Sequence, residues 1–124
     1  DIAITVEFDG VCASRSSKYV KNIVDIFVGK TNYFGCAMVF RKELIQTICP
    51  IPSFIESHDL WIPMAANIMK ANTHIDEETF LKRKHNSNVT STVSDRPLIK
   101  KLYSRLVFLF SGFIIFQRIL FKSN

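Results

Sequence analysis

The sequence has few cysteines and glycines, and its cysteines form none of the motifs that such residues usually build. Its 124 residues hold three cysteines and four glycines. The cysteines Cys12, Cys36 and Cys49 are odd in number and form no CxxC pair. Neither a disulfide framework nor a zinc knuckle is therefore indicated, and a reducing, cytoplasmic compartment is expected.

The first residues of the sequence are unusual for the start of a protein. The chain opens on Asp1 and runs directly into a strand-like stretch, with no initiator Met and no signal-type apolar run. A chain of this length holds one small domain at most. We therefore expect the 124 residues to be a fragment of a longer enzyme.

Acidic residues are scarce in the second half. Residues 1–62 carry 6 basic and 7 acidic groups, whereas residues 63–124 carry 10 and 4. A basic half could meet nucleic acid, a membrane surface or an anionic small molecule. Its basic residues flank long apolar runs and do not alternate with aromatic residues as a base-stacking surface would. No nucleic-acid partner is expected.

Short elements alternate along the chain without an internal repeat. Apolar periodicity and turn residues predict helices over 17–28, 41–48, from 59 onward and from 97 onward. Alternation and short apolar runs predict strands over 2–8, 35–40, 73–75 and 79–81, and residues 83–95 are expected to form a loop.

Asp59 stands at the start of a predicted helix, where two interpretations are open. As a helix N-cap it would contribute about 1 kcal/mol through the free amides of the first turn. As a general base it would use the same geometry, because the positive helix end favours an ionised carboxylate. Spacing alone does not choose between them.

Arg83, His85 and Trp61 also allow two interpretations each. The run Lys82-Arg83-Lys84-His85 fits a solvated basic edge. Arg83 and His85 are two residues apart, so in a continuing strand they would share a face and could bind phosphate or a metal ion. Trp61 taken alone is best interpreted as a core aromatic residue.

Five segments in order carry a resemblance to a known family. They are GCAMVFRKEL (35–44), PIP (50–52), HDLW (58–61), IDE (75–77) and LKRKHNSNV (81–89). Together they resemble the C-terminal half of a family 2 glycosyltransferase, in its bacterial rhamnosyltransferase-like branch. The resemblance implies a GT-A type fold, which is a mixed α/β sandwich.

In that family, the acid corresponding to Asp59 removes the proton from an acceptor hydroxyl, which attacks the anomeric carbon with inversion and displaces a nucleoside diphosphate. The resemblance implies a nucleotide-sugar donor and a glycan or lipid-linked acceptor. Residues 1–95 would form the acceptor side and supply the base, without the nucleotide-binding half. The segment 96–124 would be a basic, apolar helix.

The same resemblance implies roles for the surrounding residues. Gly35, Cys36, His58 and Trp61 would line the donor and acceptor pocket. Arg83 would contact the diphosphate and His85 would bind a divalent Mg or Mn ion, most of whose ligands lie in the missing half. The family's early aspartate-rich motif is absent, so the fragment is expected to be inactive by itself.

The sequence does not determine what the C-terminal helix contacts. Its apolar run over 106–116 is about half the length needed to span a bilayer. It could lie at the inner face of the cell membrane, with phenylalanines toward the lipid and basic residues toward anionic headgroups. It could equally pack on the missing half. The alternative function is therefore a non-catalytic, basic amphipathic membrane-docking module.

Overall fold

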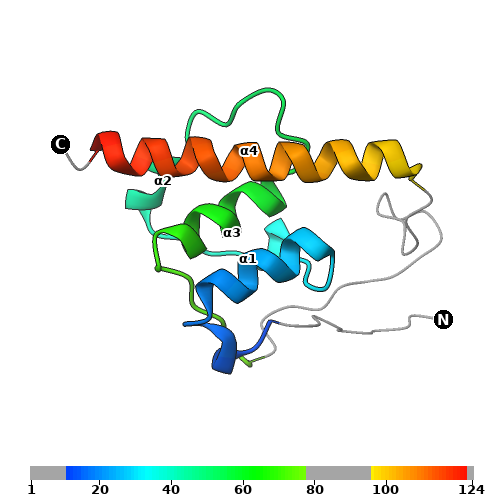
Figure 1. Ribbon diagram of the computed structural model, residues 1–124. Helices are drawn as coiled ribbons and strands as arrows, with labels where there is room; N and C mark the ends of the chain where they lie inside the picture. Colours follow the sequence, from blue (N-terminus) through cyan, green and yellow to red (C-terminus); the bar gives the residue numbers. More distant parts are fainter. Residues whose placement is uncertain (1–10, 78–95, 123–124) are drawn as a thin grey trace.

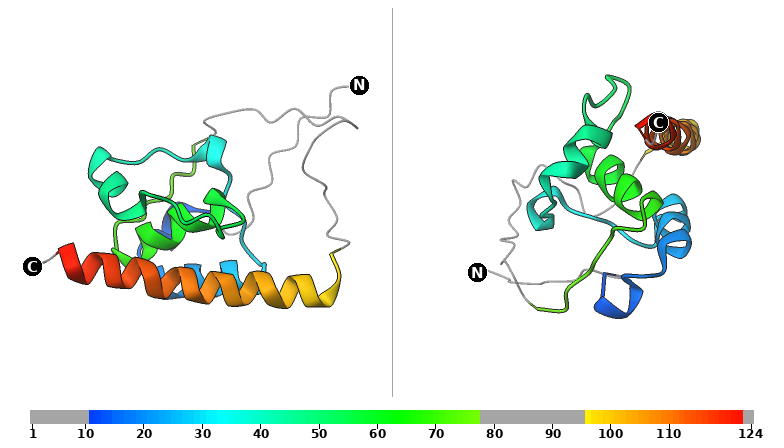
Figure 2. Two further views of the ribbon diagram at one scale, coloured as in Figure 1. Left: turned by 90° about the horizontal axis from the view of Figure 1, so that it is seen from above. Right: turned by 90° about the vertical axis from the view of Figure 1, so that its left-hand side faces the viewer.

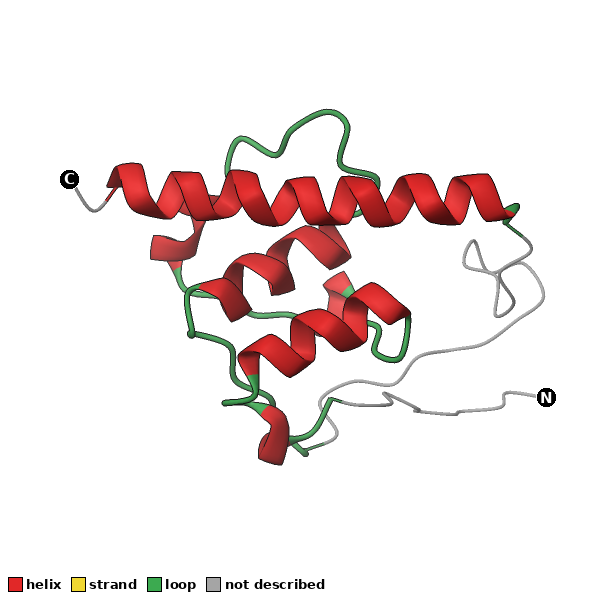
Figure 3. Cartoon of the chain, in the orientation of Figure 1, coloured by secondary structure: helices red, strands yellow, loops and turns green. Residues whose placement is uncertain are grey.

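A computed structural model describes residues 11–77 and 96–122, and every regular element in these ranges is helical (Figure 1, Figure 3). The elements are two 3₁₀ turns, η1 (Ala13–Arg15) and η2 (Gly35–Ala37), and four α-helices, α1 (Tyr19–Val28), α2 (Lys42–Ile48), α3 (His58–Ile68) and α4 (Leu98–Lys122).

Helix α3 lies at the centre of the bundle. It packs against α1, α2 and α4, and Figure 1 shows it between α1 and the long α4. Its side chains Trp61, Met64 and Ala65 are almost fully buried. The core they anchor is completed by Ile26, Tyr33, Leu44, Ile48, Phe108 and Ile115.

The predicted helix over 17–28 is confirmed as α1, with a start two residues later. Its buried residues are Asn22, Asp25 and Ile26, whereas the apolar Val20 and Val24 are exposed. Gly29 ends it with a φ of 79°, a left-handed conformation that glycine adopts without a steric cost. The predicted helix over 41–48 is confirmed as α2, which begins one residue later.

Helix α4 is a single long element that lies across α2 and α3 (Figure 2). Its inner face buries Phe108, Ser111 and Ile115. Near its C-terminal end, Arg118 donates from Nη1 to the carbonyl of Thr47 at 3.0 Å and from Nη2 to that of Pro50 at 2.7 Å. These contacts fix α4 to the rest of the bundle.

The strands predicted over 35–40 and 73–75 do not form. Residues 35–37 form the turn η2, and Met38 after it has extended angles, φ −114° and ψ 133°, yet no ladder pairs it with another segment. Val39 is fully exposed. A strand needs a neighbouring strand for its hydrogen bonds, and no described segment provides one.

The predicted α/β fold is therefore wrong. No strand occurs within residues 11–77 or 96–122, so a GT-A type mixed sheet is not supported. The error arose because short apolar runs were interpreted as buried strands without a test of their pairing. The strands predicted over 2–8 and 79–81 lie outside the described residues.

Candidate functional site

The first turn of α3 positions the predicted catalytic acid. Ser57 is the N-cap, with φ −148° and ψ 122°, and its Oγ accepts a hydrogen bond from the amide of Asp59 at 3.2 Å. Asp59 is thus the second residue of the helix, two positions after the N-cap, so the interpretation of Asp59 as the N-cap is wrong. Its carboxylate lies at the positive end of the helix, where an anion is stabilised.

Gly35 approaches this turn closely from η2. A Cβ built on Gly35 would lie 2.7 Å from Oδ1 of Asp59 and 2.7 Å from Nε2 of His58. The two side chains are themselves in contact, with 2.9 Å between Nε2 and Oδ1. Only a residue without a side chain fits between η2 and α3 in this arrangement. The structure thus brings together Gly35, His58 and Asp59, three of the predicted site residues.

The carboxylate of Asp59 has one covered and one open part. Oδ1 is buried and accepts no hydrogen bond, although Nε2 of His58 lies beside it. The side chain as a whole is 31% exposed, so its accessible surface belongs to its other atoms. His58 is 64% exposed. A polar group from outside can therefore reach this pair.

Cys36 and Trp61 occupy different environments. Cys36 is exposed in η2, next to Gly35. Trp61 is 1% exposed, and its Nε1 donates to the carbonyl of Ile48 at 3.0 Å. The guanidinium of Arg118 lies 5.4 Å from the centre of its ring. Trp61 is thus part of the core, the interpretation favoured for it alone.

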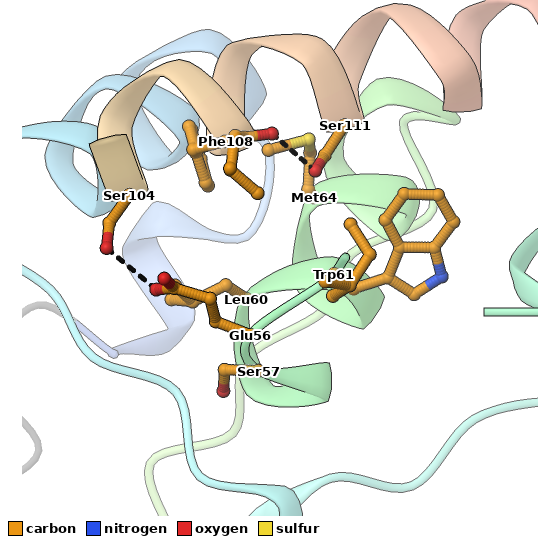
Figure 4. Close-up of a pocket in the computed structure, with 10 residues that line it drawn as sticks. Glu56, Ser57, Leu60, Trp61, Met64, Ser104, Phe108 and Ser111 are labelled. Carbon is orange, nitrogen blue, oxygen red and sulfur yellow. Dashed lines mark hydrogen bonds between the residues drawn. The ribbon is translucent and has the colours of Figure 1, made fainter. Parts of the chain in front are cut away.

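Two cavities lie near α3. Figure 4 shows the smaller one, about 30 Å³, between α3 and α4, where Ser104 donates a hydrogen bond to Glu56 at 2.7 Å. This volume holds about one water molecule, so it is a packing gap. A larger groove of about 920 Å³ runs along η2, α2 and the C-terminal half of α3. Phe34 and Ala37 line it on either side of Gly35.

Tyr33 and His74 form the polar wall of the large groove. The Tyr33 hydroxyl lies 2.8 Å from Nε2 of His74, whose Nδ1 lies 3.2 Å from the carbonyl of Cys12. Burial lowers the pKa of His74 and raises the pKa of Tyr33. Both are therefore neutral near pH 7, with Tyr33 as donor to Nε2. The prediction from sequence missed this pair because nothing in the spacing links residues 41 apart.

Arg83 and His85 lie outside the described residues, so their predicted roles stay predictions. Within the described part of the chain, no three His, Cys, Asp or Glu side chains gather as metal ligands. The described residues alone thus provide no fit for the expected divalent ion. The site chemistry below is derived without it.

No family model, curated protein or solved structure matches the chain. The predicted membership of family 2 glycosyltransferases is therefore wrong, because no family model supports it and the described residues contain no sheet. The geometry around Asp59 does not depend on that membership.

Proposed function

We propose that the chain supplies the catalytic base of an inverting glycosyl transfer from a nucleoside-diphosphate sugar to an acceptor hydroxyl. The observation that carries the proposal is the meeting of Gly35, His58 and Asp59 at the start of α3. A carboxylate that is open on one side and held at a helix N-terminus meets the minimum requirement for a general base.

The proposed reaction transfers one proton and one glycosyl group. Asp59 accepts the proton of the acceptor hydroxyl while the acceptor oxygen forms a bond to the anomeric carbon. The bond from that carbon to the diphosphate oxygen breaks, and the nucleoside diphosphate leaves with the electron pair. Because attack and departure occur on opposite faces, the anomeric configuration inverts.

The surroundings of Asp59 support this role. His58 lies beside the buried Oδ1, and the proposal assigns the exposed part of the Asp59 side chain to the acceptor. The large groove is lined by Phe34 and Ala37, which flank Gly35 and Cys36 in the sequence, and its volume suits a small organic ligand. The proposal places the donor-binding residues and the expected metal ligands outside the described residues.

The decisive variant is Asp59→Asn, which keeps the shape of the side chain but removes the base. In the longest natural form of the protein, we expect turnover to fall by about 10²- to 10⁴-fold, the usual contribution of a general base. The measurement is nucleoside diphosphate release from a panel of nucleotide sugars, which also identifies the donor.

The matched control is Glu56→Gln. Glu56 is an exposed acid just before α3 that lines the small gap between α3 and α4 and not the large groove, so its loss removes a nearby carboxylate without touching the proposed site. Its turnover should equal that of the wild type. Equal turnover in Asp59→Asn and wild type would exclude Asp59 as the base.

A further inference from the structure

The outer face of α4 carries an unbroken apolar stripe. Its members alternate at spacings of three and four residues along the helix, and each is more than half exposed: Ile99, Leu102, Leu106, Leu109, Phe113, Phe116 and Leu120. Figure 2 shows α4 along one edge of the bundle, with no described element over this side. A stripe of this length is unusual for a surface in water.

The inner face of α4 is packed against the bundle. Phe108, Ser111 and Ile115 are buried, and Arg118 is bonded to two carbonyls of the α2 region. By length and composition α4 could cross a membrane. Crossing would break these contacts and expose Trp61, the core residue beneath Arg118.

The charges of α4 are all of one sign. It holds five basic residues and no acidic one: Lys100, Lys101, Arg105, Arg118 and Lys122. They stand near its two ends and leave 12 uncharged residues between Arg105 and Arg118. That stretch is about 18 Å long, short of the roughly 30 Å of a bilayer core.

The charge distribution also disfavours a second copy as the occupant. The spacing of the stripe is that of a coiled-coil seam. Two such helices side by side would gather their basic residues with no carboxylate on either helix to neutralise them. An anionic surface has the complementary charge, and acyl chains suit the stripe.

We propose that α4 docks in the plane of an anionic lipid bilayer, with the stripe among the acyl chains and the exposed basic residues Lys100, Lys101 and Lys122 against the headgroups. The inner face remains packed on α3, so the bundle sits on the membrane surface. This inference concerns a surface away from Asp59 and does not depend on the proposed function.

The test is sedimentation of the full chain with vesicles of phosphatidylcholine, with or without phosphatidylglycerol. We expect binding to the anionic vesicles. Leu109→Ser combined with Phe113→Ser should weaken it by more than tenfold, because two stripe side chains lose their contact with lipid. Lys100→Gln combined with Lys101→Gln should weaken binding to anionic vesicles by about 30-fold, at roughly fivefold per charge.

Val20→Ser combined with Val39→Ser is the matched control, since both valines are exposed but lie outside α4. It should bind like the wild type. Fluorescence of Trp61, the chain's one tryptophan, reports the fold of each variant and should stay that of a buried indole on binding. A shift to longer wavelength would mean that α4 leaves the core and would overturn in-plane docking.

Two other results would also overturn the proposal. One is equal binding by the wild type and the stripe variant. The other is a dimer in lipid-free solution that is lost in the stripe variant, with no vesicle binding by either. That pair of findings would assign the stripe to a second copy of the chain.

Discussion

Gly35 shows how one residue without a side chain can set the geometry of a site. Its φ is not positive, so a larger residue is allowed by the backbone and is opposed only by Asp59 and His58. Gly29 presents the opposite case, since its φ of 79° disfavours a side chain although open space surrounds it. Substitution of Gly35 therefore tests the geometry of the site, whereas substitution of Gly29 tests the strain of the backbone.

Replacing Gly35 by alanine should displace the side chains of Asp59 and His58, whose ends can move. We expect turnover to fall by about 10²-fold, as for a misplaced catalytic group, with less than about 1 kcal/mol lost in unfolding free energy. Gly29→Ala should have the opposite effect. It should lower the unfolding free energy by about 1 kcal/mol and leave turnover unchanged. Loss of stability without loss of turnover in Gly35→Ala would contradict the site.

At the scale of elements, Arg118 joins α4 to the end of α2. Its guanidinium satisfies the carbonyls of Thr47 and Pro50 and lies over the ring of Trp61. A charged donor that serves two carbonyls fixes the direction of a helix better than apolar contact alone, because hydrogen bonds are directional. The packing of α4 on the bundle depends on this residue together with Phe108 and Ile115.

Arg118→Met keeps an apolar stem but leaves both carbonyls without this donor. We expect a loss of about 1.5–3 kcal/mol in unfolding free energy, measured by urea denaturation followed through Trp61 fluorescence. Arg105→Met is the control. Arg105 is an exposed arginine of the same helix, and it contacts α1 through a cation–π interaction with Phe27. It should cost less than about 1 kcal/mol. Equal losses in the two variants would contradict the special role of Arg118.

At the scale of the whole molecule, polar side chains join α1, α3 and the segment after α3. Asn22 donates to Asn67 at 3.0 Å across the core, and Asp25 is paired with Arg15 and Lys21. Burial alone would raise the pKa of Asp25, but hydrogen bonds and charge from Lys21 and Arg15 outweigh it and lower that pKa. With the neutral His74, the network favours the folded state near neutral pH.

Acid should therefore destabilise the fold in two stages. The lowered pKa of His74 means that, as pH falls below about 6.5, the unfolded chain binds a proton that the folded chain does not. The lowered pKa of Asp25 has the same effect below about pH 4. The first stage has a slope of at most about 1.4 kcal/mol per pH unit.

Urea denaturation of the wild type and His74→Gln from neutral to acidic pH measures this dependence. The variant should be less stable at pH 7, because Tyr33 and Cys12 lose their partner, but its stability should change less between pH 6.5 and 5. Identical slopes in both proteins over that range would exclude His74 as the titrating group.

Local sequence determined the helices, because periodic apolar positions and terminators such as Gly29 act within a few residues. The basic, apolar character of α4 and the carboxylate at the start of α3 could likewise be read from the chain. Tertiary structure decided what depends on distant partners. It left the segment after η2 without a strand partner, set Gly35 against Asp59, and placed Trp61 in the core. Pairing and close approach between segments far apart in sequence leave no local pattern to detect.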